Sequence, residues 1–324
     1  MSDRAAGPRQ PALATVAKPS IRGIAVADLS AVFGAVVWLA MTVTGELDAI
    51  ERALALAPLV LVPLALRTAV SGAFEAPVSR LTTTAIWLQP VGALLFAVSL
   101  VIPSPALLAA ALATPWLAVT GLLGLAAFVR TRARGGLVFP ETAIDAGFAY
   151  VSVGAVALLL AHLDLTLWFD RVIIRLTAVH FHYAGFVLPV AAGLTGRYLG
   201  DHSWEFRTVV GVVLVGPALI AVGIAFSPLV EVVAVSLFTV AVAAFGGVVL
   251  HRVVPACSRP QGLLLGIAAV ALPVSMALAL GYGISTFTGR SLGLTISTMV
   301  ALHGSLNAFG FGLCATLGWR LSAP

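Results

Sequence analysis

The sequence contains little charge and little cysteine. Only 10% of its 324 residues are Asp, Glu, Lys or Arg, whereas soluble domains carry about 25%. So few charges cannot cover a water-facing surface, which excludes a soluble enzyme and a disordered chain. The two cysteines, Cys257 and Cys314, have neither CxxC nor metal-ligand spacing, so a disulfide scaffold is excluded and we interpret both as free thiols.

Local motifs for nucleotide binding and hydrolysis are also missing. The chain has no GxxxxGKS/T or GxGxxG loop that would cradle a phosphate, and no GxSxG or HExxH. No internal repeat is visible, which argues weakly against a transporter built from two repeats. The chemistry must therefore be sought in isolated polar residues.

Apolar residues are abundant: 60% of the chain is hydrophobic and the mean hydropathy is +1.08. Because a membrane-spanning helix needs about 20 apolar residues, we predict an all-α polytopic transmembrane helix bundle of about ten spans. The ten apolar runs cover residues 23–44, 50–70, 83–102, 106–129, 142–163, 173–195, 207–226, 229–251, 262–286 and 293–316. We expect 1–22 to be a disordered cytoplasmic tail, 23–316 a single transmembrane bundle and 317–324 a short cytoplasmic tail.

The basic residues predict the orientation. If the N-terminus lies inside, fourteen of the 18 basic residues fall on the inner side, and only Arg52, Arg171, Arg175 and Arg290 fall outside. We therefore expect a multi-pass protein of the cell membrane with both termini cytoplasmic. The net charge of +5 is then explained by topology, and we predict the lipid bilayer, not nucleic acid, as the partner.

Ionisable residues inside the bilayer are costly, so they are functional candidates by default. The sixth run contains His180, His182 and Tyr183, the tenth contains His303 and Asn307, and Glu51 lies near the outer start of the second. His180 is about 10 Å and His303 about 15 Å along its helix from the outer end. We predict that His180, Tyr183, His303 and Asn307 converge on one cavity in the outer half of the membrane.

Helical geometry separates the two neighbouring histidines. Residues two apart point about 200° away from each other, so His180 and His182 cannot bind one metal on a regular helix. We expect His182 to face away and to pair with a carboxylate such as Glu51. For each histidine alone, interhelical hydrogen bonding is the alternative, and for Glu51 a solvated pair with Arg52. Asp28 and Asp145 suit structural pairing or snorkelling at the inner face.

The stretches LTAVHFHYAGF (176–186), GLTGR (193–197) and HGSLNAFGF (303–311) resemble signature stretches of YndJ-like membrane proteins. The segment ERALALAPLVLVPLALR (51–67) and the pair Pro115–Trp116 are also similar, so the resemblance covers about residues 25 to 316. It implies a polytopic membrane protein whose motif positions are Glu51, His180, His182, Tyr183, His303 and Asn307. The family is sometimes labelled as a transporter, and the resemblance leaves the reaction open.

Our first hypothesis for function is an integral membrane enzyme that uses these six residues for acid–base chemistry on a lipophilic small molecule. Isomerisation or cyclisation of an isoprenoid or polyketide in a natural-product pathway suits such a site. A proton-coupled or small-molecule transporter is the main alternative; a bis-histidine haem or metal protein and a sensor or assembly factor are two others. We predict no cofactor and no metal, and the sequence leaves the oligomeric state open.

Overall fold

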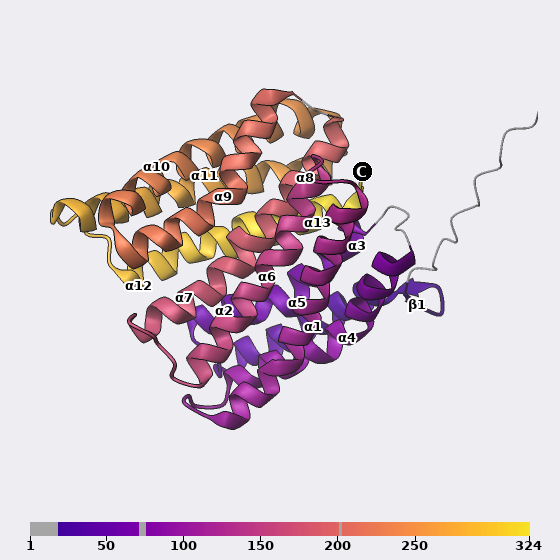
Figure 1. The fold of residues 1–324 in the computed structure, drawn as a ribbon, viewed down its shortest axis with the longest axis horizontal. Coiled ribbons are helices and arrows are strands. Elements are labelled where there is room, and N and C mark those ends of the chain that lie inside the picture. The colour runs from indigo at the N-terminus through magenta and orange to yellow at the C-terminus, as the bar shows by residue number, and fades with distance from the viewer. Residues whose placement is uncertain (1–18, 71–75, 201–202) are drawn as a thin grey trace, which may run out of the picture.

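The computed structural model describes residues 19–70, 76–200 and 203–324, and within these ranges ten helices are long and apolar enough to cross a membrane. The predicted all-α bundle is thereby confirmed (Figure 1). Spans two, six, eight and ten are each built from several helical segments. In chain order the spans are α1 (Val26–Val43); α2, η1 and α3 (Ala49–Leu56, Ala57–Leu61, Val62–Ala69); α4 (Ala76–Leu100); α5 (Leu107–Ala133); α6 (Glu141–His162); α7, η2 and α8 (Arg171–His182, Tyr183–Val187, Leu188–Leu199); α9 (Trp204–Phe226); α10, η3 and η4 (Pro228–Val248, Val249–Val253, Val254–Ala256); α11 (Arg259–Thr288); and α12, η5, η6 and α13 (Ile296–Met299, Val300–Gly304, Leu306–Leu313, Cys314–Leu321).

The helices at the C-terminal ends of four spans run further than the apolar runs. Spans four, six, eight and ten end at 133, 199, 256 and 321, against 129, 195, 251 and 316 from hydropathy. Each extension begins near an arginine, such as Arg197 in α8 or Arg320 in α13. The apolar run in the sequence ends at the arginine, whereas the helix continues beyond it. The helix can continue because the long arginine side chain places its charge at the membrane interface. The predicted tail 317–324 is accordingly helical as far as Leu321.

A short hairpin precedes the first span. Strand β1 (Ser20–Ile21) pairs with β2 (Ile24–Ala25), and the turn between them uses positive φ at Arg22 and Gly23. Residues 20–22 of the predicted disordered tail therefore belong to a hairpin, and residues 1–18 lie outside the described part of the chain.

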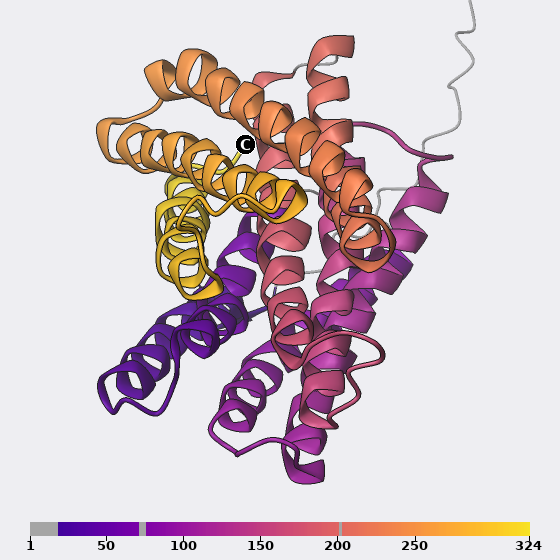
Figure 2. The ribbon, with the colours of Figure 1, turned by 90° about the vertical axis from the view of Figure 1, so that its left-hand side faces the viewer.

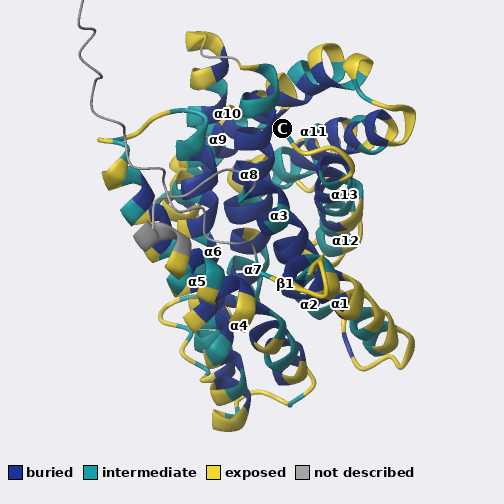
Figure 3. Ribbon diagram, turned by 90° about the vertical axis from the view of Figure 1, so that its right-hand side faces the viewer, coloured by how far each residue is buried: buried dark blue, intermediate teal, exposed yellow. Residues whose placement is uncertain are grey.

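Two groups of helices meet at a central set. Spans three to six pack in sequence through α4, α5, α6 and α7, and spans seven to ten pack through α9, α10, α11 and α13. Spans two, six and ten join the groups, because α3 contacts α8 and α13 while η2 contacts η6 (Figure 2). Span two is the most enclosed of the ten described spans, with 72% of its most apolar stretch buried, and it lies in the dark core of Figure 3. The candidate residues of the sequence lie on these three central spans.

The two ends of the described chain lie at one face of the bundle. Asp28 in the first turn of α1 accepts two hydrogen bonds from Arg320 in the last turn of α13, both at 2.8 Å. We call this side the terminal face; it lies to the right in Figure 1. Helices α2 and α7 begin at the opposite face, so the first turns of span six lie far from the termini.

Candidate functional site

The central spans are interrupted by π-helical segments. Of the five π-helical segments in the described chain, η1 lies in span two, η2 in span six, and η5 and η6 in span ten. Tyr183 opens η2, His303 lies in η5 and Asn307 lies in η6. Such segments shift the register of backbone hydrogen bonds and often occur at functional sites. Their gathering on three touching spans marks this region as the candidate site.

His303 is held in one orientation by two neighbouring side chains. Its Nδ1 lies 2.9 Å from both the backbone oxygen and the hydroxyl of Ser275, a fully buried residue of α11. The amide Nδ2 of Asn307 lies 3.1 Å from Nε2 of His303 and 2.6 Å from the Ser275 hydroxyl. Because the amide group donates, Nε2 must accept, and the partners assign the ring proton to Nδ1. His303 is therefore a neutral ring with both nitrogens engaged.

His180 lies beside it, and one of its two ring nitrogens has no hydrogen-bond partner in the described part of the chain. The two imidazole rings are 6.0 Å apart between centroids and tilted by 35°. Nδ1 of His180 lies 2.7 Å from the carbonyl oxygen of Leu176, so it carries the proton, and Nε2 bears a lone pair. No described residue hydrogen-bonds to this Nε2, and the side chain is exposed. His180 thus offers a hydrogen-bond acceptor and base at the edge of the bundle.

His182 is enclosed in the bundle and both of its ring nitrogens have protein partners. It is fully buried, its Nδ1 donates to the Ala178 carbonyl over 2.7 Å, and its Nε2 accepts from the indole of Trp116 over 3.0 Å. The Trp116 ring stacks on the imidazole at 18°, and Phe96 meets it edge-on. The expected pairing of His182 with Glu51 is wrong. Residues two apart do diverge as predicted, but His182 points into the packed core between spans three, four and five.

Glu51 instead belongs to an ion-pair cluster at the face opposite the termini. Its side chain accepts the backbone N–H of Asp48, which caps α2 in return, and Arg175 of α7 lies 3.2 Å from Glu51 and 2.6 Å from Asp48. The expected solvated pair of Glu51 with Arg52 is replaced by this cross-span contact. Burial raises the pKa of Asp48, but hydrogen bonds from the Glu51 amide and from Arg175 outweigh it, so the net shift is downward.

Tyr183 lies deeper and faces span two. Its hydroxyl donates to the Ala53 carbonyl over 2.9 Å, and its ring packs where a side chain on Gly312 would stand, since a Cβ there would be 3.0 Å from the ring. Gly312 therefore permits the close approach of spans ten and six, as small residues commonly do between membrane helices. The structure brings His180, His303 and Asn307 together, while Tyr183 joins span six to span two instead of facing the histidine pair.

The acids near the terminal face form ion pairs, as expected. Asp28 pairs with Arg320 and with Arg67 at 3.5 Å, and Asp145 pairs with Arg130 and Arg134. These contacts clamp the ends of spans one, two and ten, and of spans four and five. The Arg130–Asp145 pair is buried and therefore costly to break, whereas the Asp28 pairs are partly exposed. Within the described part of the chain, neither aspartate forms a hydrogen bond or an ion pair with the histidine pair.

Sequence reasoning missed two partners of the site. Ser275 is an ordinary polar residue in a long apolar helix, and only the packing of α11 against η5 reveals its role. Arg175 had a visible signal, because it is a charge within the sixth apolar run, but the sequence assigns it only to the four basic residues of the outer side. Within the described ranges, no group of three or more His, Cys, Asp or Glu residues could hold a metal ion.

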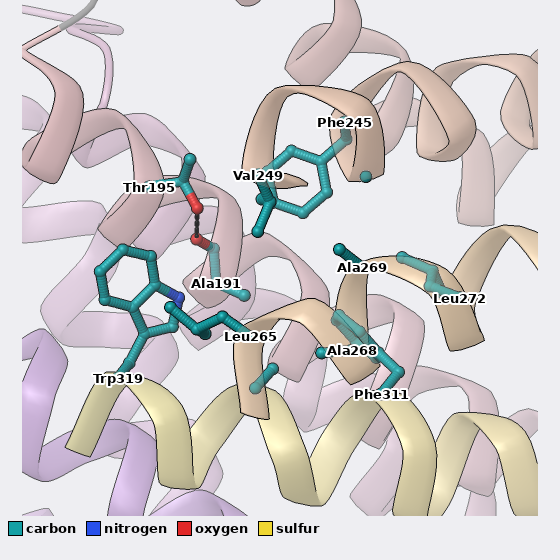
Figure 4. A pocket seen from close by; sticks show the side chains of 12 residues that line it. Ala191, Thr195, Phe245, Val249, Leu265, Ala268, Ala269, Leu272, Phe311 and Trp319 are labelled. Atoms are coloured by element: carbon teal, nitrogen blue, oxygen red, sulfur yellow. Dashed lines mark hydrogen bonds between the residues drawn. The ribbon is translucent and has the colours of Figure 1, made fainter. Parts of the chain in front are cut away.

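A separate small cavity lies between α8, α10, α11 and span ten, with Thr195, Phe245, Leu265, Phe311 and Trp319 among its lining residues (Figure 4). Its volume of about 20 Å³ leaves room for about one water molecule, whereas ligand pockets measure about 300–1,000 Å³. None of the candidate residues lines it, so it is not the cavity that the sequence predicted.

These features define the class: a polytopic helical membrane protein with an intramembrane histidine pair on interrupted spans. The family model described as YndJ-like protein matches residues 52–311, and the chain belongs to this YndJ-like family. It is 33% identical over 183 residues to the Uncharacterized membrane protein YndJ of Bacillus subtilis (strain 168). The match covers 56% of this chain and only 33% of that protein, so the chain spans about a third of its relative. No solved structure matches the chain.

Proposed function

We propose that the protein is an integral membrane enzyme that performs acid–base chemistry on a lipophilic small molecule at His180 and His303. The observation that carries the proposal is the exposed side chain of His180, whose Nε2 has no hydrogen-bond partner among the described residues, next to a second imidazole of fixed orientation. Catalytic bases are placed in this way when the missing partner is the substrate. Isomerisation or cyclisation of an isoprenoid or polyketide is the chemistry we favour.

The two rings have different roles in this proposal. Nε2 of His180 accepts a proton from one position of the substrate and returns it at another, so the protein is unchanged after turnover, while Asn307 and Ser275 keep His303 neutral and oriented. A second imidazolium 6.0 Å away would repel the first, so the pair holds one extra proton at a time. Asn307 and Ser275 are positioning residues, because they act on His303 and not on the reacting atoms. Tyr183, Glu51 and His182 support the spans that carry the pair.

We infer that the terminal face is cytoplasmic and that the site lies in the outer leaflet of the cell membrane. The distribution of basic residues supports this orientation, because eleven of the 15 basic residues in the described ranges lie toward the terminal face. On this orientation the Asp48–Glu51–Arg175 cluster lies at the outer rim of the site.

One observation favours the alternative of a transporter. Span six is tied by ion pairs at both ends: Arg175 binds Asp48 and Glu51, and Arg197 binds Glu141 through two hydrogen bonds of 2.6 and 2.7 Å. A central helix that is held by ion pairs at both faces suits a transport mechanism in which the ion pairs at the two faces break in turn.

Untargeted mass spectrometry of lipid extracts tests the enzyme proposal. Cells expressing the protein should contain at least one lipophilic compound at changed abundance, and His180→Ala should abolish this change. Ser305→Ala is the matched control, because Ser305 is exposed two residues beyond His303 and makes no side-chain hydrogen bond with the described chain. An unchanged product pattern in His180→Ala, at equal amounts of folded protein, would refute the proposal. A compound that is chemically unchanged but redistributed across proteoliposome membranes would support the transporter.

A further inference from the structure

We propose that the ligand of the histidine site is a neutral amphiphile with a free hydroxyl head, which enters sideways from the leaflet opposite the terminal face. This inference rests on the proposed function and specifies its substrate class. Three observations carry it: the single exposed position on span six between residues 172 and 199, the exposed apolar side chains of span ten, and the hydrogen-bonding character of the His180 nitrogen.

The place where the site is accessible is shown by the burial along span six. From residue 172 to residue 199 every residue is buried or half-buried except His180, which is exposed. Span six therefore reaches the surface of the bundle at His180. His180 is nine residues from the start of α7, about 14 Å along the helix, and so lies below the interface within the depth of one leaflet.

The exposed side chains near the histidine pair in span ten are apolar. Span ten, which supplies His303, exposes Leu302 (51%) and Phe309 (40%). One and a half turns deeper than His303, Phe309 meets Trp38 of α1 edge-on at 5.9 Å, which joins spans one and ten below the histidines. A molecule that reaches His180 by this route passes apolar side chains, which fits a hydrocarbon chain lying in the bilayer.

The head group must be a hydrogen-bond donor. Nε2 of His180 presents a lone pair, since the ring proton is committed to the Leu176 carbonyl. A phosphodiester, an ester or a ketone has no proton to give, whereas a hydroxyl has one. The only donor that the neighbouring ring carries, Nδ1 of His303, is committed to Ser275.

The rim of the site disfavours anionic heads. The loop and first turn at this face carry Glu46, Asp48 and Glu51 against Arg52, and Arg175 of α7 is bound to two of these carboxylates. The five residues sum to a charge of −1. A phospholipid head would meet a rim that repels it and an arginine that is already paired.

Photolabelling of the purified protein in phosphatidylcholine nanodiscs tests the proposal. The probe is hexadecanol with a mid-chain diazirine, and the competitors are hexadecanol, its methyl ether and hexadecyl phosphate. We expect labelling of the peptide that contains Leu302 and Phe309, and competition by the ether about tenfold weaker than by the alcohol, because the ether cannot donate. Hexadecyl phosphate should compete no better than the ether.

Variants assign the effect to His180. His180→Phe should abolish the difference between alcohol and ether, His180→Gln should keep part of it because its amide oxygen still accepts, and Ser305→Ala should behave as the wild type. Equal competition by alcohol and ether in the wild type, or stronger competition by the phosphate, would overturn the proposal. Binding is measured here without turnover, so a specific alcohol site with an unchanged lipid profile would refute the enzyme and leave this inference standing.

Discussion

His180 and His182 are two residues apart, and the structure predicts that their alanine variants differ in kind. His182→Ala removes a fully buried ring packed against Trp116 and Phe96, so the main cost is the cavity left behind. Truncating a buried side chain of this size costs about 2–4 kcal/mol. The lost hydrogen bond from Trp116 adds about 0.6 kcal/mol, and at most about 1.7, because unfolded helices in a membrane find other partners.

We therefore expect His182→Ala to lower the free energy of unfolding by about 3–5 kcal/mol, with packing as the larger part. His180→Ala, which truncates an exposed ring, should change it by less than about 0.5 kcal/mol. The assay is the free energy of unfolding in lipid bicelles, measured by steric trapping, for the wild type and both variants. Lipid extracts from the same expression cultures give the effect on product.

A double-mutant cycle separates packing from the hydrogen bond. Trp116→Phe removes the donor, and its coupling to His182→Ala should be about 0.5–1.5 kcal/mol. His182→Gln should be less damaging than His182→Ala, because its amide oxygen can still accept from Trp116. If His182→Ala unfolds with the free energy of the wild type while losing its product, then His182 acts in the chemistry and our structural interpretation is refuted.

Two further predictions concern packing and topology. A Cβ on Gly34 would stand 2.0 Å from the backbone oxygen of Leu59, so Gly34→Ala should lower the free energy of unfolding by about 1–3 kcal/mol. Gly121 has open space around it, so the control variant Gly121→Ala should leave this free energy unchanged or raise it. Equal effects of the two variants would contradict the packing of α1 on η1. In a chain whose native cysteines are replaced by alanine, cysteines introduced at Ser2 and Ala323 should not react with a membrane-impermeant thiol reagent in intact cells. Labelling of either cysteine would contradict the predicted cytoplasmic position of that terminus.

The sequence by itself determined the features that arise within a single helix and do not depend on how the helices pack together. Composition required a membrane, and runs of about 20 apolar residues located the ten spans, because each span must satisfy its own backbone hydrogen bonds in lipid. The pairing of His303 with Asn307 followed from their spacing of four residues, which places them on one face. The divergence of His180 and His182 followed from their spacing of two.

Only the tertiary structure decided which way each face points. In a soluble helix the polar stripe marks the solvent side, but in a membrane both lipid and protein core are apolar, so an apolar pattern carries no direction. The sequence could not tell that His182 turns to Trp116 while His180 faces the outside, or that Glu51 reaches Arg175 across 124 residues. The contact of Ser275 with His303 could not be predicted for the same reason. A contact between two spans depends on how both helices are rotated about their axes, and the sequence of one helix does not determine this rotation.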